Sequence, residues 1–140
     1  MKHMPCSLFL VAAALAGCAS TQVAPQQTAS AHTENCKATS KAEIAALFVR
    51  WNQSLQTGDP QKVVANYAQQ SILLPTVSNQ PRLTPAEKLD YFQHFLENRP
   101  SGKIDMSVIE IGCNTAWDAG LYTFSFAKTG ASVSGRYTYT

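Results

Sequence analysis

One arginine near the end of the sequence has the setting of an anion-binding residue. Arg136 lies in a run where Val133, Tyr137 and Tyr139 alternate with polar residues, a pattern typical of a half-buried strand. A charge on such a strand is costly to bury unless it is paired. A planar guanidinium can hold a carboxylate through two parallel hydrogen bonds, so Arg136 is a candidate anchor for a small carboxylate ligand. The alternatives are a solvent-facing arginine or a structural ion pair.

Four further polar residues could line a cavity. Tyr91 and His94 are three apart on a predicted helix and therefore share one side of it, while Asp118 and Tyr122 lie on a predicted strand. We predict Tyr91, His94 and Tyr122 as ligand-binding residues. Asp118 and His94 are candidate catalytic bases, although a histidine flanked by aromatic residues is more often a core-edge residue, because it supplies neither geometry nor a partner by itself.

Length and charge restrict the classes of protein that remain. The chain has 140 residues, eleven basic and nine acidic, which is enough for one domain. No basic run is present, which argues against a nucleic-acid surface, and the scattered histidines predict no metal site and no cofactor. Residues 19–35 are rich in Ala, Gln, Thr and Ser and predict a flexible tether before a domain at 36–140.

The first eighteen residues have the pattern of an export signal. Lys2 supplies a positive start, and residues 8–16 form an apolar run too short to span a bilayer. Residues 15–18 read Leu-Ala-Gly-Cys, which resembles the bacterial lipobox and predicts lipidation of Cys18. Because Ala19 rather than Asp follows, we expect an outer-membrane lipoprotein that faces the periplasm and meets the membrane only through its lipid. The alternative is an ordinary cleaved signal.

The remaining cysteines form an even pair. Cys6 would leave with the signal and Cys18 would carry lipid, so Cys36 and Cys113 stay in the domain. In an oxidising compartment such a pair predicts a disulfide that ties the start of the domain to the sheet. The alternative is two buried free thiols.

Periodicity predicts helices first and strands afterwards. A capping box at Ser40 starts a helix that we expect to end near Thr57, and Thr84 starts another with an aromatic face. The other expected elements are a short helix from Asp59-Pro60, a short strand at 72–74, and strands at 104–112, 116–127 and 132–140. This order predicts an α+β fold with N-terminal helices packed on one face of a bent antiparallel sheet. The alternation runs unbroken into Thr140, so we expect a fragment that lacks at least one strand.

Three stretches together carry a family resemblance. Residues 51–96 contain TGDP and LLPT, residues 102–126 follow, and residues 135–140 read GRYTYT. They resemble bacterial proteins of the calcium/calmodulin-dependent protein kinase II association-domain family, within the SnoaL-like, nuclear-transport-factor-2-like superfamily. The resemblance covers residues 36–140 and implies a cone-shaped roll with a pocket at its open end. It also implies that Arg136 matches a pocket arginine of the kinase hub domains.

The resemblance leaves two classes of function open. One is a ligand-binding or oligomerisation module that forms a homodimer or larger oligomer through its sheet and holds a small carboxylate at Arg136. The other is a SnoaL-like enzyme, an isomerase, dehydratase or cyclase of a small apolar acid or carbonyl compound, with Asp118 or His94 as base. A structural envelope protein is a third possibility. The sequence has no Gly-rich loop, HRD or DFG motif, so we expect no kinase activity in this chain.

Overall fold

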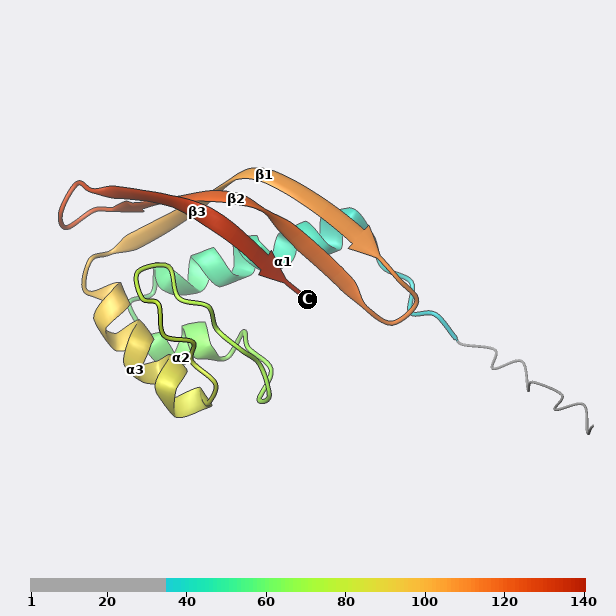
Figure 1. Ribbon diagram of the computed structural model, residues 1–140, viewed down its shortest axis with the longest axis horizontal. Coiled ribbons are helices and arrows are strands. Elements are labelled where there is room, and N and C mark those ends of the chain that lie inside the picture. Colours follow the sequence, from blue (N-terminus) through green and yellow to red (C-terminus); the bar gives the residue numbers. More distant parts are fainter. Residues whose placement is uncertain (1–34) are drawn as a thin grey trace, which may run out of the picture. The chain divides into compact units, whose positions relative to one another are not determined.

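The computed structural model describes residues 35–140. They form three helices and then three strands: α1 (Lys41–Leu55), α2 (Pro60–Val64), α3 (Pro85–Leu96), β1 (Pro100–Ile111), β2 (Ala116–Phe126) and β3 (Ser132–Tyr139). The strands make one antiparallel sheet in the order β1-β2-β3, and the sheet curves over α1 (Figure 1). The predicted α+β class, with N-terminal helices on a bent antiparallel sheet, is confirmed. The predicted signal peptide, its lipidation site Cys18 and the tether up to residue 34 lie outside the described residues.

Both longer helices begin at the predicted caps. The Ser40 hydroxyl accepts from the Glu43 amide at 3.2 Å, and the Glu43 carboxylate accepts from the Ser40 amide at 2.8 Å. Thr84 and Glu87 repeat this arrangement at the start of α3. Each box satisfies two of the amides that the first turn of a helix leaves without intrahelical partners. No helix in this part of the chain is long and apolar enough to cross a membrane.

The stretch predicted as a strand at 72–74 forms only one bridge. Leu73 and Arg82 exchange both backbone hydrogen bonds, at 3.0 and 2.9 Å, and the ladder goes no further. A buried lysine holds this loop on α3 instead. The Lys88 side chain is 1% exposed, and its ammonium donates to the carbonyl oxygens of Ser71 at 2.6 Å and Leu83 at 3.3 Å. The sequence alone did not single out Lys88.

An aromatic cluster joins the helices to the sheet. Phe95 of α3 meets Phe124 and Phe126 of β2 edge-on, with ring centroids 5.6 and 5.8 Å apart. Trp51 of α1 packs against Phe124 at 6.0 Å. Such edge-to-face pairs add to the free energy gained by burying the rings. The alternation of Tyr122, Phe124 and Phe126 predicted this inner face of β2.

A β-bulge decides which residues of β1 face the helices. The register shifts between Ile104 and Met106, which leaves Asp105 as an extra residue in β1. Beyond the bulge Ser107 faces inward and Met106 faces outward; a regular strand would reverse the two. The two strands approach so closely here that a Cβ on residue 120 would collide with the Met106 carbonyl, which explains the glycine at this position.

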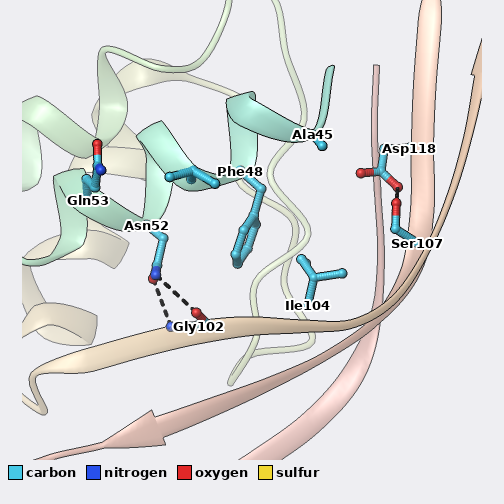
Figure 2. A pocket seen from close by; sticks show the side chains of 9 residues that line it. Ala45, Phe48, Asn52, Gln53, Gly102, Ile104, Ser107 and Asp118 are labelled. Carbon is cyan, nitrogen blue, oxygen red and sulfur yellow. Dashed lines mark hydrogen bonds between the residues drawn. The ribbon is translucent and has the colours of Figure 1, made fainter. Parts of the chain in front are cut away.

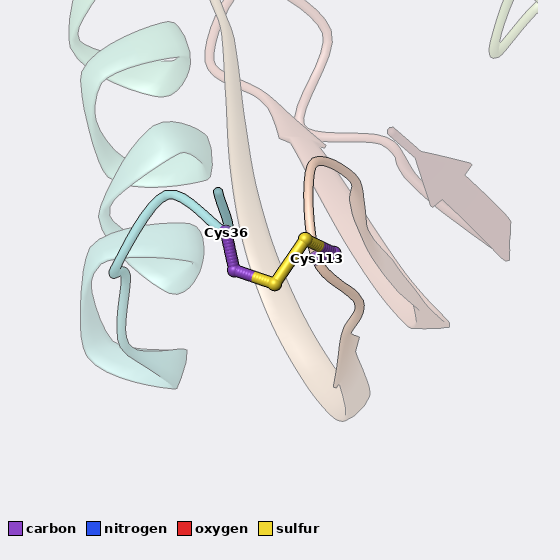
Figure 3. The surroundings of a disulfide bond; sticks show 2 residues. All are labelled: Cys36 and Cys113. Carbon is purple, nitrogen blue, oxygen red and sulfur yellow. A yellow bond between two sulfur atoms is a disulfide. The ribbon is translucent and has the colours of Figure 1, made fainter. Parts of the chain in front are cut away.

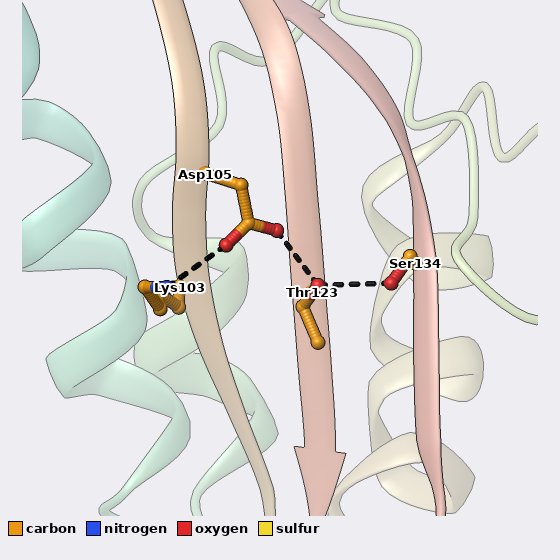
Figure 4. A network of polar contacts seen from close by, with 4 residues as sticks. All are labelled: Lys103, Asp105, Thr123 and Ser134. Carbon is orange, nitrogen blue, oxygen red and sulfur yellow. Dashed lines mark hydrogen bonds and ion pairs between the residues drawn. The ribbon is translucent and has the colours of Figure 1, made fainter.

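On the outer face, a polar network surrounds the bulge. Asp105 pairs with Lys103 at 3.1 Å and accepts from the Thr123 hydroxyl at 2.7 Å. The Thr123 hydroxyl lies 2.9 Å from that of Ser134, so the contacts reach all three strands (Figure 4). The network occupies the polar end of this outer face.

The predicted disulfide is present. Cys36, just before α1, is bonded to Cys113 in the turn between β1 and β2, with Cα atoms 4.4 Å apart (Figure 3). The Lys37 amide also donates to the Cys113 carbonyl at 3.1 Å. The entry to α1 is thereby tied to the far end of the β1–β2 hairpin.

Candidate functional site

A hollow of about 400 Å³ lies between α1 and the inner face of the sheet; we call it the central pocket. Its walls come from one side of α1 and from β1, and Asp118 of β2 lies at its end (Figure 2). Its lining residues are Ala45, Phe48, Val49, Asn52, Gln53, Gly102, Ile104, Ser107 and Asp118.

Asp118 is buried and fixed by three hydroxyl groups. Its side chain is 2% exposed. The Oδ1 atom accepts from the Ser107 hydroxyl at 2.7 Å and the Tyr137 hydroxyl at 2.9 Å, and Oδ2 lies 2.8 Å from the Tyr139 hydroxyl. The donors come from the strands on either side of β2, because Asp118 is opposite Ile109 in β1 and Tyr139 in β3. A buried carboxylate is tolerated when hydrogen bonds replace its water in this way.

The two tyrosines remain hydrogen-bond donors at neutral pH. Burial raises the pKa of Tyr139, and Asp118 raises it further; burial likewise raises the pKa of Tyr137. The Tyr139 hydroxyl also lies 2.9 Å from the Ile44 carbonyl oxygen of α1. The hydroxyl has one hydrogen and can donate it either to the Ile44 carbonyl or to Asp118, but not to both at once. Tyr139 therefore lies between α1 and the Asp118 carboxylate and can bind to either.

Other polar groups of the central pocket already have hydrogen-bond partners within the protein. The Asn52 amide donates to the Gly102 carbonyl at 3.0 Å and accepts from the Gly102 amide at 2.8 Å, which clamps α1 to β1. Phe48, Val49 and Ile104 supply apolar wall. Asp118 is the ionisable residue among those that line it. A small carboxylate in this hollow would therefore meet a like charge, whereas an amine or an alcohol would meet an acceptor.

Arg136 lines neither this pocket nor the second one described below. It is exposed and pairs with Leu121 on the outer face, because Tyr137 and Tyr139 take the inward positions of β3. It makes no ion pair with the described residues. The solvent-facing alternative matches this placement, and the geometry gives no support to Arg136 as a ligand anchor.

The remaining predicted residues separate into different places. Tyr91 and His94 line a second pocket on α3, whereas Tyr122 lines neither pocket and packs against Phe124 with ring centroids 5.2 Å apart. The sequence did not indicate Ser107 as a partner of Asp118, because its inward orientation depends on the bulge. The alternating tyrosines of β3 were a visible signal for an inner face, but only the strand register places them on Asp118.

Three-stranded sheets that curve over N-terminal helices occur in cystatin-like, nuclear-transport-factor-2-like proteins, and the comparisons place the fold in that class. A protein of unknown function with a cystatin-like fold from Methylobium petroleophilum matches with a TM-score of 0.57 and 15% identity, over 73% of this chain and 68% of that one. Aln2 from a Streptomyces species matches with a TM-score of 0.55 and 15% identity, over 73% of this chain and 82% of that one. Both likenesses concern the fold alone.

The family follows from two stronger matches. The model of the calcium/calmodulin dependent protein kinase II association domain matches residues 40–138. A crystal structure from Xanthomonas campestris, described as a putative association domain of this kind, is 40% identical over 76% of this chain and 82% of that one, with a TM-score of 0.66. The chain belongs to the calcium/calmodulin-dependent protein kinase II association-domain family. The search of curated proteins found no match.

Proposed function

We propose that this chain is a small-ligand-binding module of the association-domain family, without kinase activity of its own. The observation that carries the proposal is the central pocket, in which Asp118 is held by Ser107, Tyr137 and Tyr139 before any ligand arrives. A site whose polar group is already oriented loses less freedom on binding. Pockets that bind small molecules typically combine apolar walls with a few fixed polar groups, as here.

The favoured ligand has an apolar body and a hydrogen-bond donor at one end. The walls are aliphatic and aromatic, and the Phe48 ring could also make a cation–π contact with an organic cation. The buried acceptor is Asp118. An amine or alcohol suits this combination better than the small carboxylate expected from Arg136.

Binding is better supported than catalysis by Asp118. The hydroxyls of Ser107, Tyr137 and Tyr139 already contact the two carboxylate oxygens. A carboxylate has about four lone-pair sites, so one remains to accept a hydrogen bond from a ligand. Proton transfer would also need a second acid or base beside the substrate, and Asp118 is the one ionisable residue among the described residues that line the central pocket. His94, the other candidate base, belongs to a different pocket.

A thermal-shift comparison of benzylamine, benzyl alcohol and toluene tests the proposal on the full chain. We expect the amine and the alcohol to raise the melting temperature more than toluene, since a ligand that binds only the folded state stabilises it. Ala45→Phe, which fills the central pocket, should abolish the difference. Ala46→Phe, next to it on α1 but outside the lining, is the matched control and should leave it intact. Equal shifts in the two variants would contradict the proposal.

Self-association through the sheet is a second candidate, favoured by one observation. The outer face carries four exposed apolar residues, Met106, Val108, Trp117 and Leu121, between 41% and 49% exposed. Met106 lies opposite Leu121, so the residues form a continuous surface. Apolar patches of this kind often mark contacts with another chain.

We expect Leu121→Lys to shift a homodimer towards monomer in sedimentation at constant concentration. Ser125→Lys is the control, because Ser125 is exposed on the same face of the same strand, beyond the apolar patch. A wild-type chain that sediments as a monomer would remove this candidate.

Export as a lipoprotein remains part of the proposal and is supported by the sequence of residues 15–18. Cys18→Ala should abolish incorporation of a labelled fatty acid in a bacterial host. A wild-type protein that incorporates no labelled fatty acid would contradict the lipoprotein proposal.

A further inference from the structure

A second hollow, of about 310 Å³, lies between α3 and the loop that precedes it; we call it the α3 pocket. Its lining includes Val77 and Arg82 of the loop, and Tyr91, His94 and Phe95 of α3. None of these residues lines the central pocket, so the two pockets are separate candidate sites.

The Tyr91 hydroxyl is a buried donor without a partner. The side chain is 7% exposed, and its oxygen makes no hydrogen bond within residues 35–140. The backbone of Val77 and Thr76 and the Thr76 side chain lie close enough to affect the pKa of the hydroxyl, but none of them is at hydrogen-bonding geometry. Burial raises the pKa of Tyr91, so the hydroxyl keeps its hydrogen at neutral pH. A polar group buried in this state costs free energy unless something accepts from it.

Arg82 brings a positive charge to the same place. Its guanidinium lies over the Tyr91 ring, 5.6 Å from the centroid. One of its five N–H groups donates to the Gln80 carbonyl, and it forms no ion pair with a carboxylate in the described part of the chain. The nearby Glu87 carboxylate accepts from the amides of Thr84 and Leu83, at 2.9 and 2.7 Å; these hydrogen bonds lower its pKa, and the charge of Arg82 lowers it further.

His94 and Asp90 complete the polar part of the pocket. The His94 Nδ1 atom lies 2.9 Å from the Asp90 backbone oxygen, and since a carbonyl can only accept, Nδ1 carries a hydrogen. Nε2 is then the nitrogen left to meet a ligand. Asp90 is exposed, so water screens its charge, whereas Tyr91 is buried and Arg82 half-buried. Arg82 and the Tyr91 hydroxyl therefore supply the donors of the pocket, and Asp90 is its acidic group.

We propose that the α3 pocket binds a small carboxylate, with Arg82 as its charged anchor and the Tyr91 hydroxyl as a second donor. One oxygen of the ligand accepts from the guanidinium, and Val77 and Phe95 contact the apolar remainder. The other oxygen accepts from the Tyr91 hydroxyl once the neighbouring loop at Thr76 and Val77 moves aside, because the hydroxyl has almost no exposed surface. The ligand class is the one that the sequence suggested for Arg136, but the anchor is a different arginine. The inference does not depend on what the central pocket binds.

Calorimetric titration of the full chain with benzoate tests this site, with benzamide as the neutral compound of the same shape. We expect benzoate to bind more tightly than benzamide. Arg82→Gln should weaken benzoate at least about tenfold, which corresponds to about 1.4 kcal/mol for a lost charge-assisted hydrogen bond. Tyr91→Phe should weaken it about fivefold without lowering the melting temperature, because the hydroxyl it removes has no partner in the protein.

Arg136→Gln is the matched control, since Arg136 is an exposed arginine outside both pockets. It should leave benzoate affinity unchanged. Affinity lost in Arg136→Gln but retained in Arg82→Gln would overturn the proposal in favour of the original anchor. Equal affinity for benzoate and benzamide, or no saturable binding, would overturn it as well. If Arg82→Gln does not fold, Tyr91→Phe still tests the site. Benzoate that binds Tyr91→Phe as tightly as the wild type would contradict the proposal.

Discussion

Asp118→Ala is expected to lower the free energy of unfolding by about 2 to 4 kcal/mol, because it removes the buried acceptor of three hydroxyls. Ser107, Tyr137 and Tyr139 would each lose a hydrogen bond to the carboxylate. Tyr139 could still donate to the Ile44 carbonyl, so its loss should be the smallest of the three. Urea denaturation followed by tryptophan fluorescence measures the change.

Asp105→Ala provides the comparison within the same sheet. Asp105 also accepts from a hydroxyl and pairs with Lys103, but it lies on the outer face, where water can replace both contacts. We expect a much smaller effect than for Asp118. If the two variants unfold at the same urea concentration, Asp118 is not the organising group of the central pocket.

Removal of the disulfide should have the second large effect. Cys36 and Cys113 are 77 residues apart, and closing a loop of that length restricts the unfolded chain by an amount worth about 4.5 kcal/mol in the chain-entropy treatment. Measured effects of native disulfides are commonly about 2 to 5 kcal/mol. The double variant Cys36→Ser/Cys113→Ser should therefore melt well below the wild type.

A reductant provides the control for this prediction. It should lower the melting temperature of the wild type to that of the double variant and leave the double variant unchanged. A wild-type protein whose two thiols are alkylated without prior reduction would show that the bond does not form.

Local sequence signals predicted the elements well because their physical causes are local. The boxes at Ser40 and Thr84 set the helix starts, since each depends on residues only three apart. Alternation of Tyr122, Phe124 and Phe126 predicted the inner face of β2 for the same reason. The pairing of Cys36 with Cys113 was predictable because only two cysteines remained for the domain.

The candidate site was less predictable, because it depends on contacts between strands. The bulge at Asp105 turns Ser107 inward, and no feature of β1 alone indicates it. The alternation of Tyr137 and Tyr139 with polar residues indicated an inner face of β3 that excludes Arg136, but only the register shows that this face meets Asp118. The strand expected at 72–74 became a single bridge with Arg82, held to α3 by Lys88.

The most direct test of the central claim is a nuclear magnetic resonance titration of the isotopically labelled full chain with benzylamine. We predict saturable shifts of the backbone amides of Phe48, Asn52 and Gly102, which border the central pocket, and their loss in Ala45→Phe. Shifts confined to Leu121 and its neighbours on the outer face, or no saturable shift, would contradict the central pocket as a ligand site.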